Sequence, residues 1–219
     1  MESYQELLDG HKEFLAGFLN PEFDGYREWA KDKQAPKVMA IACCDSRMNP
    51  AIITHSGLGE IFAVNNVANI VPPYSSGKNS HHSTSSAIQF AVQHLGVEHI
   101  IIMGHSNCGG IRALVSQALV DPEDGEYSFI HNWIDILDSA RQRVEEAIPD
   151  ASEDDKAALC EKEGIKVSLS NLAGFPWVKA AMADGKLNIH GWHFNVSSGK
   201  ILAYDQVSDG FKPLIPEDA

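Results

Sequence analysis

The sequence predicts a single α/β domain with a mainly parallel central sheet flanked by helices. Its 219 residues match the usual size of one domain. Short apolar runs at 37–44, 59–65 and 97–104 lack the alternation of a half-exposed strand, which is typical of strands buried on both faces. Segments with helical spacing of apolar residues lie at 84–95 and 109–120. Alternating strands and helices of this kind favour a parallel sheet covered on both faces.

Further helices are expected before and after this core. Residues 3–20 carry apolar side chains at helical spacing and predict an N-terminal helical arm, with a second short helix over 23–32. An acidic stretch is expected to form helices over 127–147 and 151–184, the second with a break near Gly174.

The end of the chain predicts a C-terminal edge hairpin. Residues 188–196 and 200–206 have strand character, and Ser197-Ser198-Gly199 between them suits a tight turn. We see no linker to a second domain. The chain is therefore divided into a helical arm (1–33), a catalytic core (34–120), an acidic helical region (121–186) and edge strands with a tail (187–219).

The composition excludes some classes of function. Thirty Asp and Glu residues against 17 Lys and Arg give a net charge of −13. Proteins that bind phosphate backbones or anionic membranes need a basic surface, so neither nucleic acid nor a membrane is an expected partner. The polar, acidic N-terminus does not resemble a signal peptide, and no apolar run is long enough to span a bilayer. These features predict a cytoplasmic protein.

Two short motifs follow the first and third apolar runs. They are Cys43-Cys44-Asp45-Ser46-Arg47 and His105-Ser106-Asn107-Cys108-Gly109-Gly110. Ligands bind outside the carboxyl ends of parallel strands, so both motifs should face one crevice. Cysteine and histidine are preferred zinc ligands, and three protein ligands leave a fourth position open, as in catalytic zinc sites. The motifs together predict a catalytic zinc centre.

The spacing of the four cysteines does not suggest a disulfide framework. Cys43 and Cys44 are adjacent, and Cys108 and Cys160 are distant, which fits metal-binding or catalytic thiols in a reducing compartment. Successive side chains of a strand point to opposite faces, so Cys44 is expected to be a core thiol.

With these motifs the sequence resembles the β-class carbonic anhydrases, and more closely their plant-type branch. The resemblance is most specific over residues 34–114. It includes Gln34-Ala35-Pro36-Lys37, Gly59-Glu60-Ile61-Phe62, Ala68-Asn69-Ile70-Val71-Pro72-Pro73 and His190-Gly191-Trp192. It implies a zinc-dependent, reversible hydration of carbon dioxide to bicarbonate and a proton, by attack of zinc-bound hydroxide. It also implies a homodimer or higher homo-oligomer.

The resemblance assigns roles to individual residues. Cys43, His105 and Cys108 would bind zinc, and Asp45 and Arg47 would form a catalytic pair beside it. We expect Asp45 to accept a hydrogen bond from the hydroxide, and Arg47 to keep Asp45 ionised and oriented. The residues expected to bind carbon dioxide or bicarbonate are Gln34, Phe62, Val67, Phe90 and, at a helix start that suits an anion, Gly109.

Part of the family has an inhibited form in which the aspartate of the first motif binds zinc at low pH. That form goes with Trp, Gly and Tyr at three positions where this sequence has Ala40, Ala42 and Phe194. We therefore expect the open form, with water as the fourth zinc ligand.

Two other functions remain open at this point. A hydrophobic pocket discriminates weakly among apolar triatomic molecules, so the same centre could hydrolyse carbonyl sulfide or carbon disulfide. The other alternative is a non-catalytic zinc- or bicarbonate-binding module, which the loss of Asp45 or Arg47 would have indicated. Both residues are present.

Overall fold

The computed structural model describes residues 2–18, 33–75, 82–118 and 129–216. The chain divides into two compact units, Met1–Ala35 and Pro36–Ala219, which are considered separately. Helix α1 (Glu2–Phe18) is the helix described in the first unit and confirms the predicted N-terminal helix. The second helix expected in the arm lies outside the described residues.

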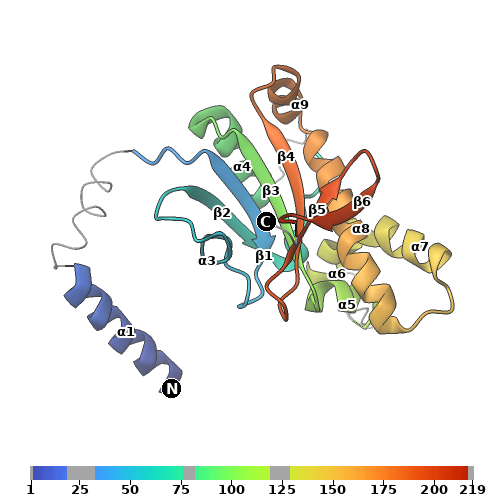
Figure 1. Ribbon diagram of the computed structural model, residues 1–219, viewed down its shortest axis with the longest axis horizontal. Coiled ribbons are helices and arrows are strands. Elements are labelled where there is room, and N and C mark those ends of the chain that lie inside the picture. Colours follow the sequence, from blue (N-terminus) through green and yellow to red (C-terminus); the bar gives the residue numbers. More distant parts are fainter. Residues whose placement is uncertain (1, 19–32, 76–81, 119–128, 217–219) are drawn as a thin grey trace. The chain divides into compact units, whose positions relative to one another are not determined.

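A six-stranded sheet organises the larger unit (Figure 1). Its strands are β1 (Val38–Cys43), β2 (Ile61–Asn66), β3 (His99–His105), β4 (Asn188–Phe194), β5 (Ile201–Asp205) and β6 (Gly210–Pro213). The spatial order is β2-β1-β3-β4-β5-β6. The β1–β2, β1–β3 and β3–β4 pairs are parallel, whereas β5 is antiparallel to β4 and β6. The predicted parallel core and C-terminal hairpin are confirmed, and β6 adds an edge strand that the sequence did not indicate.

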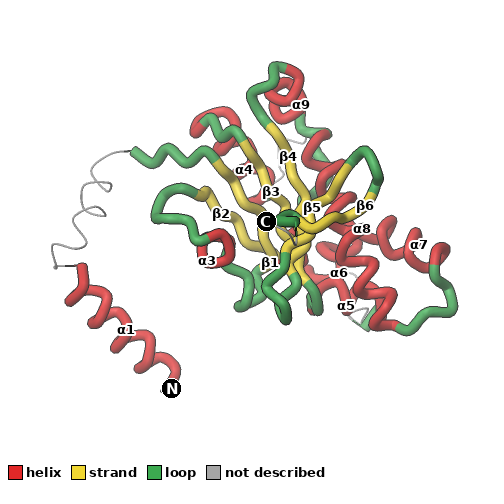
Figure 2. The backbone as a smooth tube through the Cα atoms, viewed as in Figure 1, coloured by secondary structure: helices red, strands yellow, loops and turns green. Residues whose placement is uncertain are grey.

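Helices connect and cover these strands (Figure 2). They include α3 (Pro50–Thr54), α4 (Ser83–Phe90), α5 (Gly109–Ser116), α6 (Phe129–Ile134), α7 (Asp138–Ala147), α8 (Glu153–Ala173) and α9 (Pro176–Ala183). The predicted break near Gly174 separates α8 from α9. Helix α3 was not predicted. Across the described ranges, no helix combines the length and the apolar character needed to cross a membrane.

Helices α3 and α8 begin at side-chain caps. The side chain of Asn49 accepts hydrogen bonds from the backbone N–H groups of Ala51 and Ile52, and Pro50 occupies the first turn of α3. The Ser152 hydroxyl accepts from the N–H of Asp155, and the first turn of α8 is acidic. Negative charge at this end stabilises a helix because it opposes the helix dipole.

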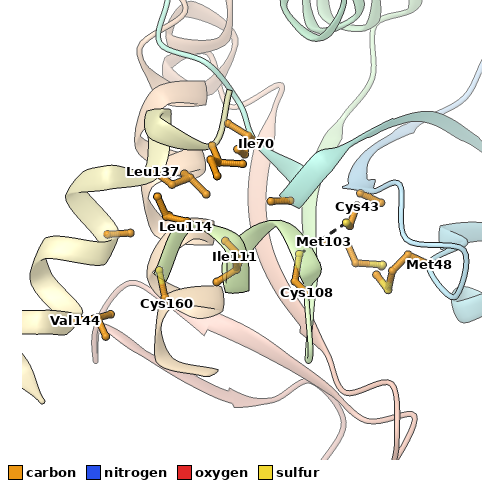
Figure 3. Close-up of a cluster of buried hydrophobic side chains, with 14 of the residues drawn as sticks. Cys43, Met48, Ile70, Met103, Cys108, Ile111, Leu114, Leu137, Val144 and Cys160 are labelled. Atoms are coloured by element: carbon orange, nitrogen blue, oxygen red, sulfur yellow. Dashed lines mark hydrogen bonds between the residues drawn. The ribbon is translucent and has the colours of Figure 1, made fainter. Parts of the chain in front are cut away.

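Two apolar clusters hold the larger unit together. One includes Met39, Ile41, Ile100 and Ile102 of β1 and β3 with apolar residues of α4, α8 and α9. The other gathers Met103 with residues of α5, α6 and α7, and it extends to the carboxyl ends of β1 and β3 (Figure 3). The second cluster therefore surrounds the strand ends where the two motifs lie.

Glycines allow α8 to lie directly against the middle of the sheet. A Cβ atom on Gly104 would lie 2.9 Å from Ile165 Cδ1, and one on Gly191 would lie 2.7 Å from Ile165 Cγ2. Both distances are shorter than van der Waals contact, so only glycine fits without movement of the helix or of its side chains. The close approach places the N-terminal half of α8 near the ends of β3 and β4.

Substitution of Gly191 by alanine tests this close packing. We expect Gly191→Ala to lower the free energy of unfolding by about 1–3 kcal/mol, because the added methyl overpacks the contact with Ile165 and Leu169. Gly210→Ala is the matched control, since its Cβ would meet Ser208 Oγ at an ordinary 3.6 Å. Urea unfolding of the two variants measures the difference, and equal stabilities would contradict the packing argument.

Candidate metal centre

The two motifs come together because their strands are parallel neighbours. Strand β1 ends at Cys43 and β3 ends at His105, so both residues reach the same edge of the sheet. Cys108 follows at the N-cap of α5. The Sγ atoms of Cys43 and Cys108 are 3.9 Å apart (Figure 3). One ligand atom from each of Cys43, His105 and Cys108 lies within 4.8 Å of the other two, and all three residues are buried.

The histidine of this cluster presents a free ring nitrogen. His105 is 1% exposed, and its Nδ1–H donates to the carbonyl oxygen of Ser106 over 2.9 Å. This bond leaves Nε2 as an acceptor, and Nε2 is buried without a hydrogen-bond partner. A buried acceptor without a partner is costly, and a backbone bond at the other ring nitrogen is the usual arrangement of a metal-binding histidine.

The spacing of the donor atoms fits a tetrahedral zinc ion. Zn–S bonds of about 2.3 Å at tetrahedral angles place two sulfur atoms about 3.8 Å apart. The observed separation of Cys43 Sγ and Cys108 Sγ agrees with this value. Soft thiolates with one imidazole favour zinc over calcium or magnesium, which prefer oxygen ligands.

The pKa values of the Cys43 and Cys108 thiols shift in opposite directions. The bond with Cys108 lowers the pKa of Cys43 most strongly, and the backbone N–H groups of Asp45 and Ala68 act in the same direction. The same thiol–thiol bond, followed by burial, raises the pKa of Cys108. For His105, burial acts to lower the pKa, but the neighbouring sulfur of Cys43 and its charge raise the pKa overall. Both sulfur atoms must be deprotonated to bind a metal ion, so metal binding at this cluster would release protons.

Asp45 and Arg47 form a bidentate pair beside this cluster. Arg47 Nε donates to Asp45 Oδ1 over 2.8 Å, and Arg47 Nη2 donates to Oδ2 over 2.7 Å. These bonds hold the pKa of Asp45 well below its usual range. Asp45 Oδ2 is also 3.9 Å from the free Nε2 of His105. An ionised, oriented carboxylate therefore lies next to the donor atoms of the cluster.

The turn after β2 packs against the start of α5. Ala68 and Asn69 have φ angles of 60° and 48°, a left-handed conformation that non-glycine residues rarely adopt. A Cβ on Gly110 would lie 2.7 Å from Val67 Cγ1, so the turn and the helix are in close contact. Val67, which was predicted to line the substrate pocket, is thereby placed beside α5, the helix whose N-cap is Cys108.

Other predicted lining residues are not brought to the cluster within this unit. Phe62 pairs with Met39 near the start of β1, whereas Cys43, at the end of β1, pairs with Asn66. Four residues of strand correspond to about 13 Å. Phe62 instead packs near Phe90, with ring centroids 6.0 Å apart, and Phe90 is 43% exposed. The roles of both phenylalanines stay predictions.

The remaining two lining residues also stay predictions. Gln34 belongs to the separate unit Met1–Ala35. Gly109 is exposed at the first residue of α5, and a Cβ there would meet no atom within 4 Å. Open space therefore lies beside the first amides of this helix.

The expectation for Cys44 was wrong. Cys44 is exposed rather than buried in the core. The alternation of side chains ends with β1 at Cys43, and the N–H of Cys44 makes a last bond to the carbonyl of Asn66 before the chain turns away. A rule that holds within a strand does not apply one residue beyond it.

Sequence reasoning missed two buried polar residues behind the cluster, Glu161 and His193. Glu161 Oε1 accepts the backbone N–H of Cys108 over 3.1 Å, and Oε2 lies 2.9 Å from His193 Nε2. A signal was present in the sequence. Buried positions on α8 recur at helical spacing, and Glu161 is one of them, as are Ala157, Cys160, Gly164, Ile165 and Ser168.

The fold and the cluster define an α/β protein with a buried Cys-His-Cys cluster that could hold a metal ion at the carboxyl edge of a parallel sheet. The sequence model of the carbonic anhydrase family matches residues 38–201. Beta carbonic anhydrase 3 of Arabidopsis thaliana is 38% identical over 200 residues, which cover 88% of this chain and 76% of that protein. The chain belongs to the β-carbonic anhydrase family.

Another relative is longer than this chain. Beta carbonic anhydrase 5, chloroplastic, also of Arabidopsis thaliana, is 39% identical over 174 residues, which cover 80% of this chain. The matched part spans only 56% of that relative's length.

Solved structures agree with the family assignment. The β-carbonic anhydrase CcaA superposes with a TM-score of 0.89 at 27% identity, over 99% of this chain and 94% of that one. A structure from work on two tetrameric β-carbonic anhydrases of Sordaria macrospora superposes with a TM-score of 0.79 at 26% identity, over 93% and 97% of the chains.

Two neighbouring cysteines allow a direct test of the ligand set. We expect the purified protein to bind zinc tightly and Cys43→Ser to lose most of it, because a serine hydroxyl is not an anion near pH 7. Cys44→Ser should keep its zinc, since Cys44 is exposed outside the cluster. Metal analysis after gel filtration measures both variants. Equal zinc loss in the two would contradict the assignment of Cys43.

Proposed function

We propose that this protein is a zinc-dependent carbonic anhydrase that interconverts carbon dioxide and bicarbonate plus a proton. The observation that carries the proposal is the ionised Asp45–Arg47 pair, 3.9 Å from the free Nε2 of a buried Cys-His-Cys cluster. Membership of the β-carbonic anhydrase family supports the same reaction. In this proposal Cys43, His105 and Cys108 hold the metal.

A bound zinc ion supplies Lewis acidity, which lowers the pKa of water toward 7 and makes a nucleophile available at neutral pH. Asp45 is the acceptor that orients this nucleophile, because its carboxylate faces the donor cluster and stays ionised. Arg47 holds both carboxylate oxygens, and its Nη2 also lies 3.5 Å from the carbonyl oxygen of Asn107. The guanidinium therefore links the loop after β1 to the loop after β3 and keeps the carboxylate from rotating.

The open form of the site is part of the proposal. Both oxygens of Asp45 already accept hydrogen bonds from Arg47, which supports a carboxylate that stays off the metal. Ala40 and Ala42 in β1, with Phe194 at the end of β4, also support this form. A zinc ion held by Cys43, His105 and Cys108 would then have its fourth position open to water.

Two further expectations extend the proposal. We propose a homo-oligomer, and the tetrameric state named for the Sordaria macrospora proteins supports it. In such an assembly, predicted pocket residues such as Gln34, Phe62 and Phe90 could be supplied to a site by the partner subunit. A cytoplasmic location remains a prediction; two relatives are named chloroplastic and mitochondrial.

Stopped-flow hydration of carbon dioxide with a pH indicator tests the reaction. We expect the zinc-loaded protein to accelerate hydration strongly, and a chelator that removes zinc to abolish the acceleration. Carbonyl sulfide and carbon disulfide are assayed in parallel for sulfide release. Faster turnover of either sulfur substrate would replace the proposal by the hydrolase alternative, and no turnover of any substrate would support the non-catalytic alternative.

Removal of the Asp45 charge tests the catalytic pair. Asp45→Asn keeps the size of the side chain but weakens it as an acceptor, so kcat/KM should fall by about 100-fold or more while zinc is retained. Asp138→Asn is the matched control, because Asp138 also pairs with an arginine, Arg141, at 2.7 Å but lies on α7 outside the cluster. Steady-state kinetics and metal analysis of both variants give the result. Full activity of Asp45→Asn would exclude the role.

A further inference from the structure

A buried carboxylate lies directly behind the metal cluster. Glu161 is 5% exposed, although the first turn of its helix, α8, consists of exposed acidic residues. Among the described residues it is the only Asp or Glu that is buried. Burial of an ionised carboxylate is costly unless its oxygen atoms are well bonded, so its position calls for a physical reason.

Both oxygens of Glu161 have partners from different parts of the chain. Oε1 accepts the backbone N–H of Cys108 over 3.1 Å, and Oε2 is 2.9 Å from Nε2 of His193, which is also buried. Because a carboxylate accepts, the ring of His193 donates from Nε2. One side chain of α8 therefore joins the start of α5 to strand β4.

The packing of α8 holds Glu161 at this position. Ile165 lies one turn further along the helix and contacts the backbone at Gly104 and Gly191, where a larger residue would push the helix away. Gly104 immediately precedes His105, and Gly191 lies two residues before His193 on the same face of β4. The close approach thus brings the carboxylate within reach of Cys108.

Cys108 needs such support because its backbone makes an unusual turn. Asn107, the residue before it, has a φ of 59°, in the left-handed region. The backbone N–H of Cys108 itself donates to Glu161 Oε1 over 3.1 Å. This bond ties the amide of Cys108 to α8, directly after the left-handed residue.

We infer that Glu161, held in turn by His193, is a positioning residue that fixes Cys108 for metal binding. This inference rests on the proposed zinc site. The carboxylate does not touch the substrate or the metal; it acts through the amide of Cys108. Partners of this kind that orient a metal ligand commonly change metal affinity by about 10- to 100-fold when they are removed.

Three substitutions of Glu161 distinguish the effect of the position of its acceptor oxygen on zinc affinity from the effect of its charge. Glu161→Ala removes the acceptor, and we expect zinc affinity to fall by about 10- to 100-fold. Glu161→Gln keeps an acceptor oxygen at nearly the same place and should restore most of the affinity. Glu161→Asp keeps the charge but is one methylene shorter, so its affinity should be lower than that of Glu161→Gln. The Asp variant also keeps the test informative if the alanine variant fails to fold.

Ser168→Ala is the matched control on the same helix. Ser168 is fully buried, and its Oγ accepts the backbone N–H of Val71 over 3.2 Å, away from the cluster. Ser168→Ala therefore loses a side-chain acceptor of a backbone N–H, as Glu161→Ala does. We expect a lower unfolding midpoint in urea, with zinc affinity equal to that of the wild type.

Zinc affinity is measured by competition with a chromophoric chelator. The cobalt-substituted proteins are then compared by their thiolate-to-cobalt absorption, which should change in Glu161→Ala and Glu161→Asp and not in Ser168→Ala. Wild-type affinity and absorption in all Glu161 variants would overturn the inference, as would an equal loss in Ser168→Ala. If the wild type itself binds no zinc, the proposed function fails as well, so the two failures are distinguishable.

Discussion

Parallel pairing of β1 with β3 is the constraint on which the site depends. The register matches Ala42 with Met103, so β1 ends at Cys43 close to where β3 ends at His105. Residues far apart in the chain thus share one edge of the sheet. This pairing is stabilised by the apolar side chains that the two strands bury on both faces. The chemistry of the site is therefore located by the core of the protein and not by the loops alone.

Around that edge, neighbouring segments keep the polar groups in fixed positions. The Asp45–Arg47 pair faces the cluster from one side, and the turn at Ala68 packs on the start of α5. Glu161 on α8 approaches from behind and bonds the amide of Cys108. Buried polar groups are stable only when they are bonded, so each of these contacts also restricts where the donor atoms lie. A rigid set of donors is what a tetrahedral metal ion requires.

The predictions from sequence succeeded where a pattern is local and strong. Apolar runs located the strands that lead into the two motifs, and Gly174 located the break between α8 and α9. They failed where the outcome depended on one residue or on packing. Cys44 lies one position beyond its strand and is exposed. Glu161 is one of several acidic residues on α8, and the others in its first turn are exposed. Only its spacing from the buried apolar residues of α8 distinguished Glu161 from them.

By itself, the sequence determined the class of fold and the kinds of ligand atoms, because hydrophobic periodicity and residue chemistry can be read along the chain. The two motifs and their family resemblance were sufficient to assign Cys43, His105 and Cys108 as candidate ligands. The tertiary structure decided which groups surround them. Phe62 lies about 13 Å along β2 from the strand end, whereas His193 and Glu161 lie behind Cys108. Such contacts depend on the register of the sheet and on the close approach of α8. Both arise from packing among distant segments, and the local spacing of residues along a helix does not say which partners a buried side chain meets.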